Sequence, residues 1–526
     1  MNIIKGNDLK EYLKDKNFVD FKKRFVFSDM MSEIKSHKEK LVALYGLRRT
    51  GKTTLMYQAI QELNNFDKCT FIQCSGKDTI DDLFKYLSKD NSNYFFIDEI
   101  TKIKDFIRFS SCLSDNFINK NRKVIMSGTD SLGFNIAASD ELYDRITMLH
   151  TTYIPFYEYN YLLDKDIFTY MRYGGTLSDE NVFYNEEKTN EYTNTSISKN
   201  ILHTYKYWKD ENETSIFDNI SSSDMTSFIN RIIRKEDIKF ITKVLSDKFK
   251  ASEISSVRQM YEVKAKTNLL LPEEEREDIP DAKIFKDESL REKIRDALLI
   301  KDEHDTDIND DLARGIKYNL LKLDVIKKQD DTFYLIQPGM RYCHIKAIVE
   351  TIKENPILKN NFSKKDIEMI CEKIMQDIEG HLLENICITD LQDYYRMDIG
   401  INVNKYNPNA LAGEFDIVLE NKVNKKAIAL EVKRSDKAIE KQKKWLNNKE
   451  LCDFYNLDTG YNIVGKYVLY NGGNLTNDDN VVYKNMSDFL KAPMNNINID
   501  FPEFNRLNTD ANKDKIFEID NNVERE

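Results

Sequence analysis

Residues 41–60 read LVALYGLRRTGKTTLMYQAI and decide the fold of the first part of the chain. A short apolar run leads into a loop of the pattern GxxxxGK[ST], and a helix-prone stretch follows. Such a turn points backbone N–H groups at phosphate oxygens, and the helix N-terminus adds partial positive charge. The stretch therefore predicts a P-loop that binds ATP with Mg²⁺. Its members are Gly46, Leu47, Arg48, Arg49, Thr50, Gly51, Lys52, Thr53 and Thr54.

Two side chains of this loop have expected roles. Lys52 should reach the β- and γ-phosphates, and the Thr53 hydroxyl should ligate Mg²⁺. The alternative is a structural glycine loop without a ligand. The strand-like run before the loop and the helix-like run after it favour the nucleotide site.

Short apolar runs recur along the first 160 residues. They lie at 41–45, 69–73, 94–98, 123–127 and about 149–154, and helix-length segments separate them. This rhythm predicts an α/β fold in which helices cover five parallel strands on both faces.

The third of these runs ends in two carboxylates, at the edge of the sheet where α/β proteins bind ligands. Asp98 is expected to hold Mg²⁺ through water, and Glu99 to polarise the attacking water. The next run ends in Ser127-Gly128-Thr129, so Ser127 and Thr129 are candidates to contact the γ-phosphate; the alternative is an ordinary strand-to-loop turn. Arg145 is a candidate arginine finger, with a structural ion pair as the alternative.

Length and composition limit the remaining choices. A chain of 526 residues exceeds what one hydrophobic core supports, so several domains are expected. The net charge of −11 gives no global attraction to nucleic acid or to an anionic membrane. Seven scattered cysteines argue against a zinc site or a disulfide framework, and no long apolar run predicts a membrane span. A cytoplasmic protein is expected.

Changes in composition predict five units. The ATPase core is expected at 1–160, a helical region with an Asn-, Thr- and Ser-rich polar insertion at 161–285, and a poorly ordered tail at 493–526. A helix followed by a hairpin turning near 329–331 suggests a winged-helix-like domain at 286–345, with an ordinary helix-and-hairpin connector as the alternative. Residues 346–492 resume a mixed α/β pattern.

A second set of charged residues lies on two expected strands, GEFDIVLE at 413–420 and KAIALEVK at 426–433. Alternation puts Glu431 and Lys433 on one face, near Asp416 on the neighbouring strand. Two carboxylates can hold Mg²⁺ or Mn²⁺, while a lysine positions water or stabilises charge on a phosphate. Glu384 on the preceding helix is the expected further metal ligand, and Glu414 is an alternative to Asp416. A charged, exposed hairpin is the competing interpretation.

Basic residues follow this pair of strands, and a charged helix is expected at 436–449. The spacing suits a DNA backbone, although a solvated amphipathic helix explains it nearly as well. The basic residues are Arg434, Lys437, Lys441, Lys443, Lys444 and Lys449.

The order of motifs resembles a known family. KRFVFSDMMSEI, LYGLRRTGKTTLMYQAI, YFFIDEI, VIMSGTDS, YIPFYEY and YMRYGGTL, followed by GHLLEN, GEFDIVL and LEVKRSDK, are similar to prokaryotic AAA-type or archaeal-type ATPases that carry a C-terminal PD-(D/E)XK-like domain. The resemblance implies an ASCE-type P-loop core, a helical and winged-helix middle and a restriction-endonuclease-like module. It also suggests a link to DNA or to mobile-element defence. GEFD replaces the literal Pro-Asp of the pattern.

The leading hypothesis is therefore an ATP hydrolase whose nucleotide state controls a DNA-directed, nuclease-like domain containing a second Mg²⁺ or Mn²⁺. Its rival is a signalling or scaffolding ATPase of STAND type, whose C-terminal module only binds a protein partner or DNA. A helicase-like motor is disfavoured because translocation motifs are not recognisable. A homo-oligomer is compatible with either of the first two hypotheses.

Overall fold

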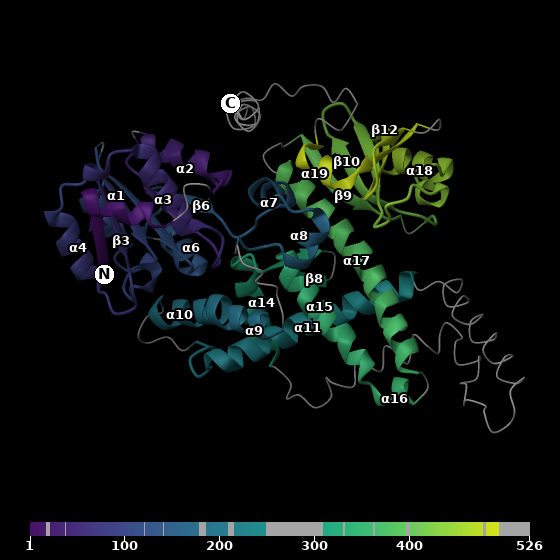
Figure 1. Cartoon of the computed structure of the whole chain (residues 1–526), viewed down its shortest axis with the longest axis horizontal. Coiled ribbons are helices and arrows are strands. Elements are labelled where there is room, and N and C mark those ends of the chain that lie inside the picture. The colour runs from purple at the N-terminus through teal and green to yellow at the C-terminus, as the bar shows by residue number, and fades with distance from the viewer. Residues whose placement is uncertain are drawn as a thin grey trace, which may run out of the picture.

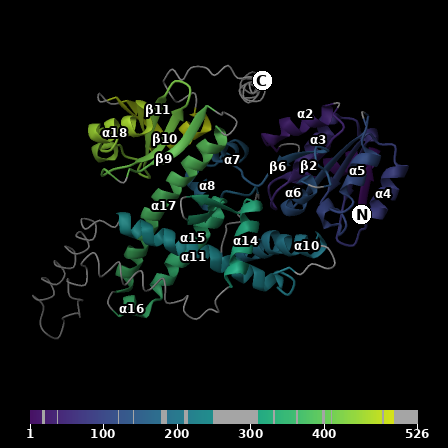
Figure 2. The ribbon, with the colours of Figure 1, turned by 180° about the vertical axis from the view of Figure 1, so that it is seen from behind.

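The computed structural model describes residues 1–16, 21–36, 38–119, 121–139, 141–177, 186–208, 215–248, 309–329, 332–360, 363–395, 400–408, 410–476 and 480–493. An N-terminal α/β part lies at one end of the molecule and a C-terminal α/β part lies at the other, with a helical middle below and between them (Figures 1 and 2). The expected tail at 493–526 falls almost entirely outside the described residues.

The first sheet has six strands in the order β1-β3-β4-β5-β2-β6. All neighbouring strands are parallel except β1, which pairs antiparallel with β3. The strands are β1 (Asn2–Lys5), β2 (Leu41–Tyr45), β3 (Cys69–Gln73), β4 (Tyr94–Asp98), β5 (Lys123–Gly128) and β6 (Ile146–His150). The helices that accompany them are α1 (Gly6–Lys14), α2 (Val26–Lys35), α3 (Lys52–Leu63), α4 (Ile80–Lys89), α5 (Ser110–Phe117) and α6 (Ser131–Ser139).

Alternating residues of these strands enter two separate cores, as expected when helices cover both faces. Phe95 and Ile97 pack with α4, α5 and α6, whereas Phe96 packs on the other face with α2 and α3. The α/β fold class is confirmed.

Two details of this sheet differ from expectation. The antiparallel strand β1 was not predicted, because four residues at a terminus give almost no periodic signal. The last strand ends at His150 instead of 154. The physical reason is that the hydroxyls of Thr151 and Thr152 bind the P-loop region, through Thr50 Oγ1 and Leu47 N respectively.

The middle of the chain is mostly helical. Its elements are α7 (Phe156–Leu163), α8 (Ile167–Tyr173), α9 (Glu186–Tyr192), a π-helical turn at Thr193–Ser198, α10 (Lys199–Trp208), α11 (Ser222–Lys248), α14 (Asp310–Lys322), β7 (Ile326–Gln329), β8 (Thr332–Leu335), α15 (Pro338–Lys353) and α16 (Pro356–Lys359). Within the expected polar insertion, residues 186–208 are helical, and Thr193, Ser196 and Ser198 are buried. The polar composition of this segment therefore does not mean that its side chains are exposed to solvent.

The expected winged-helix unit is described only from residue 309 onward. There α14 leads into an antiparallel hairpin in which Ile326 pairs with Leu335 and Gln329 pairs with Thr332. Residues 286–308 lie outside the described part of the chain, as do 330 and 331 at the expected turn. The winged helix stays a prediction.

A second mixed sheet forms the C-terminal α/β part, in the order β13-β14-β12-β11-β10-β9. Its elements are α17 (Lys364–Tyr394), β9 (Ile401–Tyr406), β10 (Phe415–Asn421), β11 (Lys426–Val432), α18 (Lys449–Thr459), β12 (Asn462–Tyr470), β13 (Leu475–Thr476), β14 (Val481–Asn485) and α19 (Met486–Lys491). The helix expected at 436–449 is wrong. A short 3-10 turn covers Glu440–Lys443, and α18 begins at Lys449, where Asn448 caps it by accepting from Leu451 N.

Helix α17 joins the middle of the protein to this second sheet, and its diagonal course is visible in Figure 1. One continuous apolar core contains residues of α7, α8, α11, α15, α17 and strands β9 to β12. Asp390 of α17 accepts from Tyr153 Oη at 2.6 Å and from the Phe156 backbone N–H at 2.7 Å. Asp393 accepts from Tyr157 Oη at 2.7 Å. The connection that follows β6 is thereby fixed to α17.

None of the described helices combines the length and the apolar character that a membrane crossing requires.

Asp390→Ala is expected to destabilise the protein by about 2–4 kcal/mol, because it leaves a buried Tyr153 hydroxyl and a buried Phe156 N–H without their acceptor. Urea denaturation of the full chain measures the effect. Asp458→Ala is the matched control, since Asp458 accepts a similar bond from Tyr406 Oη at 3.2 Å on the exposed surface. The control should change stability by less than about 0.5 kcal/mol. Equal losses of stability in the two variants would contradict the role of the hydrogen bonds that Asp390 accepts.

Candidate functional sites

The P-loop is held in a shape that only glycine permits at two positions. Gly46 has φ +144°, and a Cβ there would lie 2.6 Å from Thr151 Oγ1 and 2.8 Å from Thr152 N. Gly51 has φ +86° and ends the loop immediately before α3. Backbone and threonine hydroxyls therefore approach the loop more closely than any side chain would allow.

Lys52 points back into the turn of this loop. Its Nζ donates to the Gly46 carbonyl at 2.8 Å and to the Leu47 carbonyl at 2.7 Å. Burial lowers the pKa of Lys52 to about 8, and the nearby Glu99 and Asp98 carboxylates oppose that shift. A cation held in a cradle of backbone groups is the arrangement that receives a polyphosphate.

The two carboxylates at the end of β4 face different partners. Thr53 Oγ1 donates to Asp98 Oδ2 at 3.0 Å, and Ser127 Oγ also donates to Asp98. Burial raises the pKa of Asp98 above its usual range. Glu99 has φ +59°, and its Oε2 lies 3.3 Å from Thr129 Oγ1, which donates to it, and 3.6 Å from Lys102 Nζ.

Sheet order explains how these residues meet. Strand β5 lies between β2 and β4, with Gly128 paired to Tyr45 and Met126 paired to Ile97. Ser127 and Thr129 thus lie between the P-loop and the Asp98-Glu99 pair. Insertion of a strand between the P-loop strand and the acidic strand is the arrangement of ASCE-type P-loop proteins.

Arg48 and Arg49 lie at the edge of the first site, whereas Arg145 lies away from it. The Arg48 carbonyl accepts a hydrogen bond from Tyr192 Oη at 3.0 Å. Arg49 has φ +62°, and its carbonyl accepts from Leu177 N at 2.8 Å. Arg145 precedes β6 at the opposite end of the strands, where its carbonyl accepts from Leu41 N. That position is one strand length, roughly 15 Å, from the P-loop. Its guanidinium forms an exposed ion pair with Asp115 at 2.8 Å.

Sequence reasoning missed a buried ion pair under the P-loop. Arg24 donates to Glu158 from Nε at 3.0 Å and from a terminal nitrogen at 2.8 Å. It also donates to the backbone carbonyls of Thr50 and Thr151, each at 2.8 Å. Arg24 directly follows two other basic residues, Lys22 and Lys23, so local sequence gave no sign that it alone of the three is buried.

A second missed contact joins the middle of the chain to the loop after β5. Thr204 Oγ1 of α10 donates to Asp130 Oδ1 at 2.7 Å, and Asn200 Nδ2 donates to the Thr129 carbonyl at 2.7 Å. Helix α10 thereby holds Thr129, whose hydroxyl donates to Glu99. The pairing is long-range, and no local motif announces it.

The C-terminal set of charged residues is gathered at the ends of β10 and β11. Lys433 Nζ donates to Asp416 Oδ2 at 3.1 Å and to Glu431 Oε2 at 2.5 Å, and Asp416 Oδ2 also accepts from Val432 N at 2.8 Å. Both carboxylates are buried. Burial and the Asp416 charge raise the pKa of Glu431 to about 8. Burial would lower the pKa of Lys433, but Asp416, Glu431 and Glu384 outweigh it and raise that pKa above its usual range.

The expected further ligand, Glu384 of α17, faces other partners. Its Oε2 lies 3.1 Å from His381 Nδ1 and 3.9 Å from Lys405 Nζ. Lys405 also pairs with Glu414 at 3.4 Å, so Glu414 lies beside Glu384 at the rim. Partial burial would lower the pKa of Lys405, but Glu384, Glu414 and Asp416 outweigh it and raise that pKa above the usual range.

A metal fits this set only in part. Across the described part of the chain, no three His, Cys, Asp or Glu side chains are arranged to hold a metal ion. The expected trio of Glu384, Asp416 and Glu431 is therefore not gathered round one point. The Lys433 ammonium lies between the last two and donates to both. Glu431 Oε1 is nevertheless buried with no hydrogen-bond partner, which leaves one acceptor available to a cation.

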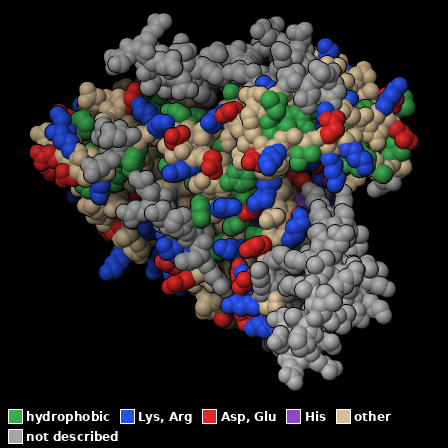
Figure 3. Space-filling view, turned by 45° about the vertical axis from the view of Figure 1, so that its right-hand side comes forward, with side chains coloured by type: hydrophobic (Ala, Val, Ile, Leu, Met, Phe, Trp, Pro, Cys, Tyr) green, Lys and Arg blue, Asp and Glu red, His purple; other side chains and the backbone are tan. Residues whose placement is uncertain are grey.

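The expected basic helix is replaced by local pairings. Arg434 Nε binds Glu379 at 2.7 Å, and Lys443 Nζ binds Glu440 at 2.9 Å. On the face drawn in Figure 3, Lys and Arg side chains alternate with Asp and Glu and do not form one patch.

Comparison with known proteins places the first part of the chain. Residues 38–160 match the family model described as an AAA domain. Together with the P-loop and the strand order, this match defines residues 38–160 as an AAA-type P-loop ATPase domain, a class that uses ATP and Mg²⁺. A search of curated proteins gave no match.

Solved structures give weaker likenesses. A Walker-type ATPase of Pyrococcus abyssi is 13% identical, with 61% of this chain and 94% of that chain covered, at a TM-score of 0.25. The Aeropyrum pernix ORC2 protein is 9% identical, covering 63% and 93%, at 0.28. The Thermotoga maritima RuvB Holliday junction branch migration motor is 14% identical, covering 63% and 92%, at 0.21. Scores this low carry no argument about function.

ATP affinity is expected to fall as pH rises through about 8. Lys52 has a pKa of about 8 in the free protein, and a bound polyphosphate favours the ammonium, so binding takes up a proton above that pH. The affinity for a fluorescent ATP analogue with Mg²⁺ should be level from pH 7 to 7.5 and fall by up to about tenfold per pH unit above 8. Lys52→Arg stays charged, so its affinity should be level throughout. A parallel fall in both proteins would contradict the assignment.

Proposed function

We propose that this protein is an Mg²⁺-dependent ATP hydrolase whose nucleotide state controls a nuclease-like C-terminal domain that acts on DNA. The observation that carries the first half is the AAA domain, in which Asp98 and Glu99 lie beside Lys52 and Thr53 at the P-loop. The second half is supported by the buried Asp416, Glu431 and Lys433 cluster, and by the rigid connection between the two sites. We also propose a role in mobile-element defence, which is supported only by the resemblance of the sequence motifs to those of the family.

Each residue of the ATP site receives a role in this proposal. Lys52 binds the β- and γ-phosphates, while Thr53 and Asp98 hold Mg²⁺, which would neutralise phosphate charge as the bond breaks. Glu99 orients the attacking water, and Thr129 keeps its carboxylate aimed. Ser127 fixes Asp98. Buried hydroxyls around a carboxylate pair favour one defined geometry, as positioning of water demands.

Arg145 enters the proposal only through a second copy of the chain. It lies at the far end of the strands from the P-loop of its own subunit, so it acts on ATP bound to a neighbour in a homo-oligomer. Its exposed guanidinium and its surface partner Asp115 leave it accessible for that contact.

Control of the C-terminal domain is supported by a continuous chain of buried contacts. Arg24 binds the P-loop carbonyl of Thr50 and the carboxylate of Glu158 on α7. The segment directly before and within α7 donates to Asp390 and Asp393 of α17. Glu384 lies on the same helix, six residues or about 9 Å from Asp390. Movement of the P-loop on nucleotide binding is therefore passed to the helix that borders the second site.

At the second site, Asp416 and Glu431 would hold a divalent cation in competition with Lys433, with Glu384 as a further ligand. Such an ion would act as a Lewis acid on a phosphate oxygen. Lys433 then positions water. Hydrolysis adds the water oxygen to phosphorus and breaks one P–O bond, which leaves a phosphate monoester on one end and a hydroxyl on the other.

One observation favours a second function for this domain. The described residues do not form a three-ligand metal group, and Lys433 forms an ion pair with both carboxylates without a metal. A module of this kind that binds a protein or DNA without cutting it would make the chain a signalling or scaffolding ATPase of STAND type.

Lys52→Ala is expected to remove most ATP binding, whereas Glu99→Gln should retain binding and lose at least about a hundredfold in turnover, because phosphate contact and water activation reside on different residues. Steady-state phosphate release and equilibrium ATP binding measure the two effects. Lys102→Ala is the control for a charge beside Glu99 and should retain most activity. Normal hydrolysis by Glu99→Gln would overturn its role.

Asp416→Ala is expected to abolish Mn²⁺-dependent cleavage of DNA while leaving ATP hydrolysis within about twofold, because the two sites have separate ligands. Single- and double-stranded DNA are tested with Mg²⁺ or Mn²⁺, with and without ATP. Asp458→Ala, on the surface of the same domain, is the control. Failure of the wild type to cut either substrate under every condition would assign the domain to binding alone.

A further inference from the structure

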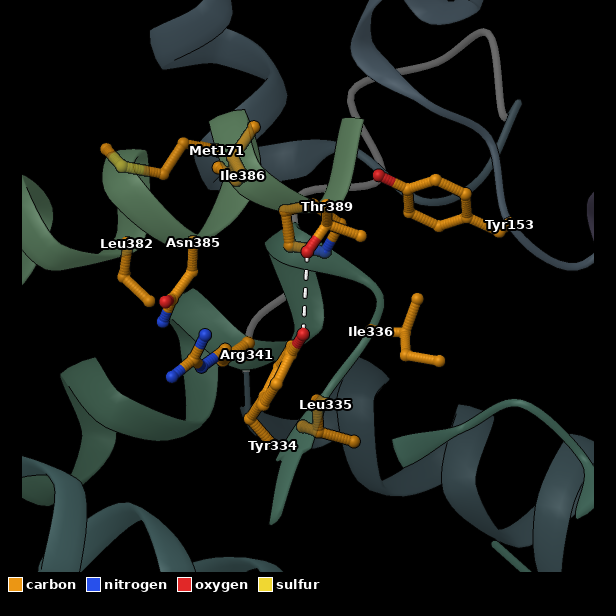
Figure 4. A pocket seen from close by; sticks show the side chains of 11 residues that line it. Tyr153, Met171, Tyr334, Leu335, Ile336, Arg341, Leu382, Asn385, Ile386 and Thr389 are labelled. Carbon is orange, nitrogen blue, oxygen red and sulfur yellow. Dashed lines mark hydrogen bonds between the residues drawn. The ribbon is translucent and has the colours of Figure 1, made fainter. Parts of the chain in front are cut away.

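A small pocket with a few polar side chains lies where the segment after β6, the β8–α15 corner and α17 meet. It has a volume of about 20 Å³, room for roughly one water-sized group or a few atoms of a ligand. Figure 4 shows Arg341 and Asn385 facing each other across it, with Tyr334 and Thr389 beside them. The rest of its wall is mainly apolar, with Met171, Leu335, Ile336, Pro338, Leu382 and Ile386, and includes Tyr153.

The Arg341 side chain is the unusual feature of this pocket. It is only 5% exposed, and its guanidinium carbon lies 4.7 Å from the ring centroid of Phe240 and 4.7 Å from that of Tyr334. Aromatic rings attract the cation but do not accept the N–H groups that lie in the guanidinium plane. Within the described chain, no side-chain hydrogen bond or ion pair of Arg341 is found, and its Nε is buried without a partner.

The nearest opposite charge does not remove this deficit. Asp237 of α11 acts on Arg341 electrostatically without a hydrogen bond to it, and Asp237 Oδ2 is itself buried without a partner. Burial raises the pKa of Asp237 to about 7, so its carboxyl can become neutral at little cost when another anion approaches. A buried guanidinium with open in-plane donors costs free energy unless an acceptor completes it.

We infer that this pocket binds a small oxyanion of carboxylate type, held by Arg341 and Asn385. A planar guanidinium fork matches the two oxygens of a carboxylate. The Asn385 amide supplies a further donor, and the Tyr334 and Thr389 hydroxyls, 3.4 Å apart, supply rotatable ones. The apolar wall suits a ligand with few other polar atoms. This site is independent of the proposed ATP hydrolysis and DNA cleavage.

The pocket lies beside the part of α17 that connects the two proposed sites. Asn385 and Thr389 lie on α17 between Glu384 and Asp390, and Tyr153 at the pocket wall is the residue that donates to Asp390. A bound oxyanion therefore lies in a pocket whose wall includes α17, the β8–α15 corner and the segment after β6.

Sodium formate tests the inference, in the full-length protein with saturating ATP and Mg²⁺ so that the P-loop is filled. Formate replaces chloride at constant ionic strength, and its dissociation constant is taken from the concentration dependence of the melting temperature and from saturation-transfer NMR of the formate proton. The wild type should show saturable binding. Arg341→Met should weaken it at least tenfold, and Arg341→Lys should weaken it severalfold because the ammonium lacks the fork.

The controls separate this site from general anion binding. Arg314→Met removes an arginine that is 77% exposed and should bind formate as the wild type does. Asn385→Leu keeps the guanidinium and should weaken formate binding severalfold, which preserves the test if Arg341→Met does not fold. Equal formate affinity in the wild type, Asn385→Leu and any folded Arg341 variant would overturn the inference, as would a crystal structure with formate present that shows only water in the guanidinium plane.

Discussion

Arg24 lies beneath the P-loop with its charge removed from water, and this single buried cation constrains much of the N-terminal half. Its N–H groups are satisfied at once by Glu158, by the Thr50 carbonyl and by backbone after β6. A buried charge must be paired and hydrogen-bonded to persist. The residues before α2, the P-loop and α7 therefore have to be in register together, so none of them can shift without uncovering the ion pair.

The same logic recurs along α17. Glu379 accepts from Arg172 and from Arg434, Glu384 faces His381 and Lys405, and Asp390 accepts from two donors of the β6–α7 connection. Each buried carboxylate fixes a different neighbour to one rigid helix. Together they make the middle region and the C-terminal sheet a single packed body, as their shared apolar core also indicates.

The two sites differ in how complete they are. At the P-loop, cation, hydroxyl and carboxylates already occupy complementary positions, and the backbone has the strained geometry that phosphate binding requires. At the second site, Lys433 fills the space between the carboxylates and Glu384 is turned aside. The Lys433 ammonium offsets part of the negative charge there without a metal, so cation binding has to compete with an internal ammonium.

How much of this the sequence determined depends on the range of each interaction. The P-loop, the acidic pair after β4 and the parallel strands were readable from local pattern, because turn geometry and strand burial depend on neighbours within a few residues. The proximity of Asp416, Glu431 and Lys433 followed from strand alternation. Tertiary structure alone decided that Arg24 is buried while its basic neighbours are not, that the polar residues near 193–198 are interior, that the stretch after Lys433 is not a basic helix, and that Arg341 faces a pocket. Those outcomes depend on partners far away in the chain, and desolvation of a charge is set by what surrounds it in space, which no local pattern contains.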